Sequence, residues 1–408
     1  MKRSRIDEWM QQNERIVPWN RKAVERYQLE KLNEMLAYCR QHSAFYSYLP
    51  ERIDSLKEIE MIPLMTEKDF IANAEALLLV SQRDVIHIVT DETSATTGKA
   101  KRIFYTEEDQ ARTVDFFSCG LGEFICAGDS TLVCMPGGTP GSIGSLVARA
   151  VERLGARATV IGTDKTYREM INALQASEAN TIVAMPIPLL SFARYMKAER
   201  VKINLTGVLV SADTCTPEVE AMLREELDCE IYPHYGSRES GLGGAITCPA
   251  HAGMHLWESD LYVEIIDEAG NVLPVGSQGE IVLTTLRRQA MPLIRYRTGD
   301  VGVIYAEECS CGSIVRRLKN PRRRNILVLD IADADSVMFS HKQLLDYRIA
   351  LSAEGCSLEA VIVKPIDEVE LKKSLAGLLP DDMVLKMSVR RYNAKEERPF
   401  FSKKRVIL

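Results

Sequence analysis

The spacing of hydrophobic positions predicts helices and strands in alternation over the first two thirds of the chain. Leu29, Leu32, Met35 and Leu36 recur at the spacing of one helix face, so residues 1–50 are expected to be helical. Further along, helix-period segments alternate with short apolar runs, in the order 107–127, 130–135, 145–153, 158–162, 166–177, 181–186, 188–198, 207–213, 216–226 and 230–236. This alternation favours a mostly parallel sheet with helices on both faces, an α/β architecture.

The pattern changes after about residue 255. Residues 261–273 (LYVEIIDEAGNVL) and 279–286 (GEIVLTTL) alternate between apolar and polar positions and are joined by turn residues, so a small antiparallel region is expected. A basic run at 316–325 then interrupts the pattern. Strand, helix and strand patterns follow at 360–365, 367–379 and 384–392. We therefore expect a large domain over 1–320 and a small α+β domain over 321–408.

Composition and charge narrow the class of protein. The 408 residues include 51 Lys and Arg against 57 Asp and Glu, a net charge of −6, which argues against nucleic acid as a partner. No apolar run approaches the length of a bilayer span, and the first residues lack the apolar core of a signal peptide. Most of the 10 Cys stand singly in apolar stretches, as reduced thiols do. We therefore expect a cytoplasmic protein with neither a nucleic-acid nor a membrane partner.

A first candidate for chemistry is the hydroxyl-rich turn from Thr93 to Lys101 (TSATTGKAK), which follows an apolar strand pattern. Its backbone N–H groups, hydroxyls and cations are suited to phosphate oxygens. The turn does not match GxxxxGK[ST], so the P-loop mechanism is not implied. A plain surface turn explains the same composition.

A second candidate is the segment from Tyr235 to Gly241 (YGSRESG), directly after a strand pattern. Open α/β sheets bind ligands where their parallel strands end, and Glu239 there is suited to a magnesium ion that also binds phosphate. The alternative for Glu239 is an exposed carboxylate in a glycine-rich turn.

A third candidate is the segment from Ile294 to Asp300 (IRYRTGD), in which two cations flank an aromatic residue before a turn. The Asp300 carboxylate can accept hydrogen bonds from both hydroxyls of a ribose. The alternative is that Asp300 caps the turn and pairs with Arg297.

Cysteine and histidine spacing predicts a metal site. Cys248 and His251 form a CxxH pair, and Cys309 and Cys311 form a CxC pair, which together supply the Cys₃His ligands of a structural tetrahedral Zn²⁺ site. His255 is the substitute nitrogen ligand if His251 points away. Four protein ligands leave no open position, so a catalytic zinc is not expected. The alternatives are reduced surface thiols, or a 309–311 pair with an unrelated role.

In order and spacing, the three candidate segments resemble the signature motifs of the acyl-adenylate-forming (AMP-binding) enzymes. The similarity is strongest to the phenylacetate–CoA ligase branch and its relatives that transfer AMP to a phenolic hydroxyl. The stretch GSQGEIVLTTLRRQAMPLIRYRTGD matches that branch almost continuously, and the resemblance covers about residues 25–318. It implies a large N-terminal adenylate-forming α/β domain with a small antiparallel region, and a small mobile α+β lid domain at the C-terminal end.

The resemblance also implies roles for individual residues. Glu239 binds Mg²⁺ and takes part in catalysis, Asp300 binds the ribose, and Arg316 or Arg317 contacts the nucleotide near the hinge. The catalytic lysine of the small domain is Lys403 or Lys404. The remaining phosphate- and nucleotide-binding residues are Thr93, Ser94, Thr96, Thr97, Gly98, Lys101, Ser211, Ala212, Asp213, Tyr235, Gly236 and Ser237, and those near the acyl group are Pro186, Ile187 and Tyr235.

The implied activity is ATP-dependent activation of a carboxylic acid, aryl or small acyl, to an acyl-adenylate, followed by thioester formation with CoA. ATP, Mg²⁺, CoA and a structural Zn²⁺ are the implied cofactors and cosubstrates, and a homodimer is the usual assembly. One alternative is transfer of the acyl group or AMP to another acceptor, such as an amine, a carrier thiol or a phenolic hydroxyl. Another is a nucleotide-binding homologue without catalysis.

Several positions depart from the family pattern. Ala95 replaces a glycine of the phosphate loop, Ala100 replaces a proline, and Ser402 replaces the glycine before the tail lysine. The hinge reads Asn-Pro-Arg-Arg-Arg-Asn over 320–325, without the acidic pair of the family. Domain rotation or the second half-reaction is therefore expected to differ from the family pattern.

Overall fold

The computed structural model describes residues 3–91, 101–305, 307–324, 328–352, 355–393 and 406–407. The chain divides into two compact units. Unit 1 comprises Met1–Glu123, Thr139–Leu154 and His234–Arg324, and unit 2 comprises Phe124–Gly138, Gly155–Pro233 and Asn325–Leu408. The division into domains 1–320 and 321–408 stays a prediction.

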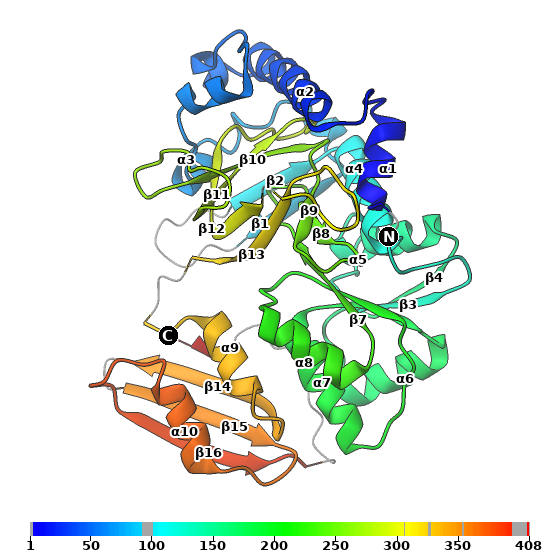
Figure 1. Ribbon diagram of the computed structural model, residues 1–408, viewed down its shortest axis with the longest axis vertical. Coiled ribbons are helices and arrows are strands. Elements are labelled where there is room, and N and C mark those ends of the chain that lie inside the picture. Colours follow the sequence, from blue (N-terminus) through cyan, green and yellow to red (C-terminus); the bar gives the residue numbers. More distant parts are fainter. Residues whose placement is uncertain are drawn as a thin grey trace. The chain divides into compact units, whose positions relative to one another are not determined.

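Unit 1 contains the predicted antiparallel region. Its antiparallel strands follow the order β10-β11-β12-β13-β9-β8-β7 (Figure 1), and β1 pairs with β2 as a separate hairpin. The helices are α1 (Arg5–Asn13), α2 (Arg21–His42), α3 (Glu67–Ala72), α4 (Glu107–Leu121) and α5 (Ile143–Arg153), with short 3-10 helices at Ala44–Tyr48, Leu56–Met61 and Gln82–Asp84. The strands are β1 (His87–Asp91), β2 (Lys101–Tyr105), β8 (Ala245–Thr247), β9 (Met254–Leu256), β10 (Leu261–Ile266), β11 (Gln278–Thr285), β12 (Tyr296–Tyr305) and β13 (Arg317–Arg323).

Unit 2 contains the predicted parallel sheet, with strand order β7-β6-β5-β3-β4. Its elements are β3 (Ser130–Val133), β4 (Arg157–Val160), α6 (Tyr167–Ser177), β5 (Thr181–Ala184), α7 (Pro186–Ala198), β6 (Gly207–Val210), α8 (Pro217–Leu227) and β7 (Glu230–Tyr235). Strand β7 continues from unit 2 into unit 1 at Pro233. Every residue of β3, β5 and β6 is buried, which is the pattern of a sheet covered on both faces.

The C-terminal part of unit 2 is a small α+β segment, as predicted. It contains α9 (Ile331–Phe339), β14 (Leu344–Ser352), β15 (Gly355–Ile362), α10 (Glu368–Ala376), β16 (Leu385–Arg391) and β17 (Val406–Ile407). Its sheet has the order β16-β15-β14-β17, in which β14 and β15 are antiparallel and both outer pairs are parallel. Helices α9 and α10 pack together against this sheet (Figure 1).

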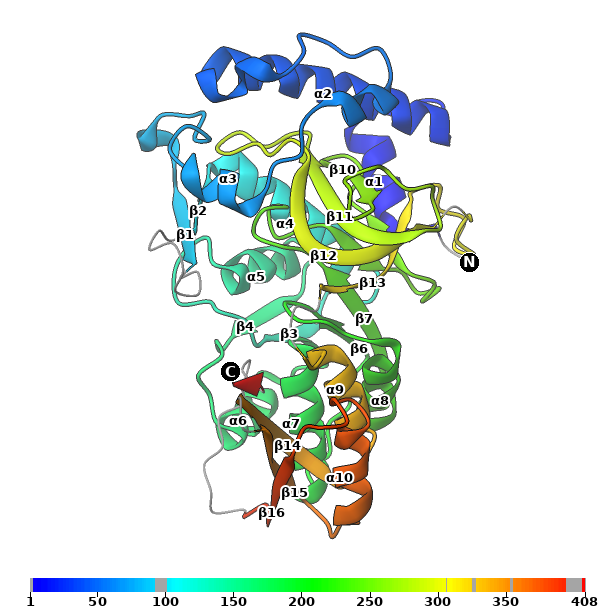
Figure 2. The ribbon, with the colours of Figure 1, turned by 90° about the vertical axis from the view of Figure 1, so that its left-hand side faces the viewer.

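Helix caps encoded in the sequence fix where several helices begin. Thr106 and Asp109 form a capping box at the start of α4, which packs against α5 in unit 1 (Figure 2). Pro186 occupies the first turn of α7, where its missing N–H is not needed. Throughout the described ranges, no helix is both long and apolar enough to cross a membrane.

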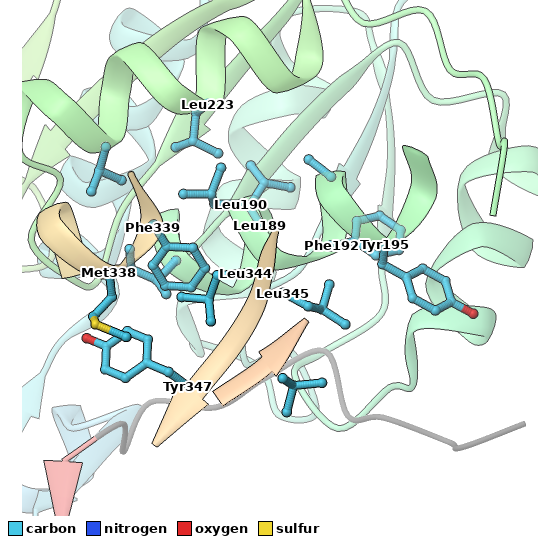
Figure 3. Packing of buried hydrophobic residues seen from close by; sticks show 14 of the residues in the cluster. Leu189, Leu190, Phe192, Tyr195, Leu223, Met338, Phe339, Leu344, Leu345 and Tyr347 are labelled. Atoms are coloured by element: carbon cyan, nitrogen blue, oxygen red, sulfur yellow. The ribbon is translucent and has the colours of Figure 1, made fainter. Parts of the chain in front are cut away.

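The core of unit 2 extends from the parallel sheet into the C-terminal segment. Leu189, Leu190 and Phe192 of α7 lie in one apolar cluster with Phe339 and Leu344 (Figure 3). The segment that begins at residue 328 is therefore packed against α7 and α8 by a buried hydrophobic surface.

Candidate functional site

The first candidate cluster surrounds Lys101, the first residue of β2. Its ammonium group is ion-paired with Glu239, lies 2.8 Å from the Tyr296 hydroxyl and lies 3.1 Å from a Glu67 oxygen. The lysine is only 6% exposed. The described part of the phosphate-loop segment, the turn after β7 and the start of β12 therefore meet in unit 1, as the three sequence motifs predict for a shared site.

Charge keeps both members of this pair ionised. Burial alone would lower the pKa of Lys101, but the Glu239 carboxylate and the Tyr296 hydroxyl raise it above its usual range. Burial would raise the pKa of Glu239, but Lys101 lowers it below the usual range. Glu239 is thus a mostly buried, ionised carboxylate paired with a lysine, the kind of group that can accept a divalent cation.

The second cluster surrounds Asp300 on β12. The Tyr235 hydroxyl donates a hydrogen bond to Asp300 Oδ2 at 2.9 Å, and Arg323 Nη1 lies 3.4 Å from Oδ1. Strand pairing between β12 and β13 sets Asp300 directly opposite Arg323. Burial raises the pKa of Asp300, although Arg323 and Tyr235 oppose that shift.

The neighbouring arginines have other partners. Arg297 binds Glu280 at 2.6 Å, so the alternative in which Asp300 pairs with Arg297 is not what the structure contains. Arg316 lies 3.2 Å from a Glu25 oxygen, and Arg317 donates to the carbonyls of Ala252 and Glu307. The structure therefore brings Arg323 to Asp300 and places Arg316 and Arg317 in different contacts.

The turn after β7 is shaped by a glycine. A Cβ on Gly236 would lie 2.3 Å from the carbonyl oxygen of Leu242, so no other residue fits without displacing the backbone. Ser237 and Ser240 exchange hydrogen bonds and close the turn that carries Glu239. His234, before the turn, packs against the rings of Phe116 and Phe117, and burial lowers its pKa to about 3.

The predicted residues of unit 2 lie where β5 and β6 end. These parallel neighbours place Pro186 and Ser211 at the same edge of the sheet. Ala212 has φ +66°, a left-handed conformation that is uncommon for a residue with a side chain, in the connection that follows β6. Asp213 accepts a hydrogen bond from Thr214 N at 2.9 Å. Ile187 belongs to the apolar core cluster of this unit.

A group of buried metal-ligand residues lies in unit 1. The ligand atoms of Cys248, His255, Cys309 and Cys311 all lie within 4.8 Å of one another. His251 is not in this group; its N–H donates to the carbonyl of Cys248 at 2.9 Å. The nitrogen ligand in the group is thus the substitute that the sequence offered, His255.

The spacing of these atoms fits a tetrahedral ion. Zinc–sulfur and zinc–nitrogen bonds of about 2.3 and 2.0 Å place two sulfurs about 3.8 Å apart, and a sulfur and a nitrogen about 3.5 Å apart. The Cys248 and Cys309 sulfurs are 3.8 Å apart, and Cys311 Sγ lies 3.5 Å from His255 Nε2. A hydrogen bond from Cys248 lowers the pKa of Cys311 to about 3, which favours the thiolate that metals bind.

Some predicted residues fall outside the described ranges, namely Thr93, Ser94, Thr96, Thr97, Gly98, Lys403 and Lys404. Sequence reasoning missed three partners that the structure supplies. Glu67 and Tyr296 surround Lys101, and Arg323 faces Asp300. Signals for two of them were present, because Tyr296 lies inside the third motif and Arg323 lies inside the basic run.

Comparison with known proteins gives the family and the fold. A family model described as AMP-binding enzyme matches residues 81–287. Phenylacetate-coenzyme A ligase of Thermus thermophilus is 24% identical, covering 89% of this chain and 86% of that protein. The enzyme of the same name from Pseudomonas putida is 26% identical, covering 68% and 66%. A crystal structure of 2-hydroxyisobutyryl-CoA ligase in the postadenylation state has the same fold, with a TM-score of 0.78 at 18% identity over 97% of this chain and 90% of that one.

Proposed function

Because the chain belongs to the AMP-binding enzyme family, we propose that it activates a carboxylic acid with ATP to an acyl-adenylate and then transfers the acyl group to coenzyme A. The observation that carries this proposal is the meeting of Lys101, Glu239 and Tyr296 from three separate motifs. Relatives named phenylacetate-coenzyme A ligase support an aryl or small acyl acid as the substrate.

The charge of the reaction explains why this cluster is needed. A carboxylate attacks the α-phosphate of ATP and pyrophosphate leaves, so two anions must approach one another. In our proposal Glu239 binds the Mg²⁺ that arrives with ATP, and Lys101 turns from Glu239 to the phosphates. The hydroxyl residues Thr93, Ser94, Thr96 and Thr97, together with Gly98, hold the β- and γ-phosphates.

The nucleoside is assigned to the second cluster. Asp300 accepts hydrogen bonds from the ribose hydroxyls, and Arg323 takes the nucleotide contact that the sequence assigned to Arg316 or Arg317. The adenine and acyl groups are assigned to Ser211, Ala212, Asp213, Tyr235, Gly236 and Ser237, with Pro186 and Ile187 near the acyl group. For the first half-reaction we assign the catalytic lysine to Lys403 or Lys404, in a lid domain over 321–408.

We further infer that Cys248, His255, Cys309 and Cys311 hold a structural Zn²⁺. Their atom spacing and burial support this assignment, and four protein ligands leave no position for a reacting water. Metal analysis of the purified protein tests it. About one zinc per chain is expected, and a content near zero in undamaged protein would contradict the assignment.

We also propose that the protein acts as a homodimer in the cytoplasm.

Pyrophosphate exchange with a panel of carboxylic acids tests the activity. Acid-dependent exchange with ATP and Mg²⁺, together with AMP release that depends on CoA, is the expected result. Exchange that CoA does not change would point to an amine or another acceptor. Absence of exchange with every aryl and small acyl acid of the panel would contradict the proposal and favour a binding protein.

A further inference from the structure

Arg194 is a buried cation in the middle of α7 whose partners lie far away in the sequence. The residue is 3% exposed. Its Nη1 donates to the carbonyl oxygens of His341 and Leu344 at 3.0 and 2.6 Å, and its Nη2 donates to the carbonyl of Phe339. Phe339 is the last residue of α9, His341 lies in the connection that follows, and Leu344 is the first residue of β14. One side chain of the parallel-sheet region thus binds the connection between two elements of the C-terminal segment.

The surroundings explain how a charge is tolerated at this position. Arg194 Nε lies 3.3 Å from a carboxylate oxygen of Glu226, whose side chain is only 9% exposed. The guanidinium also lies over the ring of Phe339, 5.3 Å from its centroid. A buried charge needs such partners because an unpaired one is strongly unfavourable. Carbonyls at the end of α9 suit a cation further, because the helix dipole is negative there.

Apolar and polar contacts around Arg194 join the same two regions. Leu190 and Leu223 lie with Met338 and Leu345 in the cluster of Figure 3. Beside it, the hydroxyls of Thr216 and Ser336 are 2.7 Å apart, and Lys342 pairs with Glu225. Arg194 is therefore the polar centre of a mainly hydrophobic surface that joins α7 and α8 to the C-terminal segment.

Strand pairing carries this contact toward the tail. Strand β14 begins at Leu344, whose carbonyl Arg194 binds, and Ile349 of β14 pairs with Val406 of β17 in parallel register. In the sequence Lys404 and Lys403 stand two and three residues before Val406. A contact that holds β14 in place therefore also holds β17, which begins two residues after Lys404.

We propose that Arg194 is a positioning residue for adenylation: it holds the C-terminal segment on α7 and α8, and so sets the place of β14 and β17. The proposal rests on the function proposed above, because it needs a half-reaction that the tail serves. Arg194 itself touches no substrate in this account. A guanidinium is required since lysine has neither the planar fork nor enough donors for three carbonyls and a carboxylate.

Substitution of Arg194 gives the first test. Arg194→Met is expected to lower kcat of acid-dependent pyrophosphate exchange about a hundredfold, because a misplaced catalytic group loses roughly that much rate, and Arg194→Lys should fall between. The matched control is Lys197→Met, which removes a cation of the same helix that binds the same Glu226. The control should keep wild-type exchange. Equal rates for Arg194→Met and Lys197→Met would overturn the proposal.

A disulfide supplies a second test, because a positioning role predicts a gain in rate that a purely structural role does not. Thr216→Cys with Ser336→Cys replaces the hydroxyl contact by a crosslink between α8 and α9, in a Cys215→Ser background that removes the neighbouring thiol. In an Arg194→Met protein the oxidised crosslink should raise the rate of pyrophosphate exchange at least about tenfold, and reduction should abolish that gain. A crosslinked protein with no gain in rate contradicts the positioning role.

Amide hydrogen exchange separates failure of this proposal from failure of the proposed function. Faster exchange over 344–352 in Arg194→Met, but not in Lys197→Met, is expected whether or not the right acid has been found. Unchanged exchange there contradicts the docking role by itself. If wild-type protein forms no adenylate while this difference in exchange remains, then the proposed function fails and the docking contact stands.

Discussion

Two buried ion pairs, one in each unit, differ in what surrounds the cation. Lys101 in unit 1 contacts the side chains of Glu239, Tyr296 and Glu67. Arg194 in unit 2 binds main-chain carbonyls as well as Glu226. Side chains can turn toward an incoming ligand, whereas carbonyls held between a helix and a strand cannot. The difference indicates that the first pair is suited to bind a ligand. The second pair is a structural joint, which holds the C-terminal segment on α7.

The largest expected effect comes from breaking the first pair on its acidic side. Glu239→Gln should reduce acid-dependent pyrophosphate exchange about a hundredfold or more, because charge stabilisation in the transition state is lost. Lys101 keeps Tyr296 and Glu67, so the melting temperature should change little. Exchange kinetics and thermal melting measure the two quantities. Exchange within a few-fold of wild type would mean that Glu239 is only a partner for Lys101.

The cluster of Cys248, His255, Cys309 and Cys311 is a third kind of buried polar group, for which we proposed a structural Zn²⁺. Cys309→Ser should lower the free energy of unfolding by about 3 kcal/mol, since a structural metal contributes directly to folding. Chemical denaturation with metal analysis checks this. Cys229→Ser, at a half-buried cysteine outside the cluster, serves as the control. A similar stability for both variants, with zinc retained, would remove the assignment.

Acid sensitivity is the next effect in size. Burial lowers the pKa of His234 from 6.5 to about 3, so its contribution to stability is complete above pH 6.5 and is lost as the pH falls toward 3. Between pH 6.5 and pH 4 this loss should reach about 3 kcal/mol. In His234→Phe the fall in unfolding free energy over that interval should be smaller by this amount. An equal fall in the free energy of unfolding over this pH interval in both proteins would contradict the assignment.

The smallest effect tests the joint against the site. Glu226→Gln removes a mostly buried partner of Arg194 and should destabilise the fold by about 2 kcal/mol. Glu67→Gln changes a partner of Lys101 whose side chain is 48% exposed, and should change stability by less than about 0.5 kcal/mol. Denaturant titration of the two variants compares them directly. If Glu67→Gln proved the more destabilising, the distinction between site and joint would be wrong.

The sequence predicted the parts of the fold that depend on local periodicity. Buried apolar runs such as 181–184 and 207–210 became β5 and β6, because a strand covered on both faces is apolar at every position. Alternation after residue 255 likewise gave the antiparallel strands β10 and β11. These signals need no knowledge of distant contacts.

The partners that were missed depend on distant contacts. Arg323 meets Asp300 through the register of a strand pair, and one residue of slippage would turn it to the other face. CxxH spacing favoured His251, but Cys248, Cys309 and Cys311 gather around His255, which lies on β9 opposite Arg317 of β13. Arg194 is a charged residue in an apolar helix, and its carbonyl partners lie about 150 residues away in the C-terminal segment. These partners are therefore determined by contacts between residues far apart in the sequence, which local patterns do not predict.

One measurement tests the central claim most directly: product analysis of wild-type protein with ATP, Mg²⁺, CoA and an aryl or small acyl acid. Mass spectrometry should find the acyl-CoA thioester and AMP in equal amounts, both lost in Glu239→Gln. Formation of ADP in place of AMP, or thioester formation that survives intact in Glu239→Gln, would contradict the account.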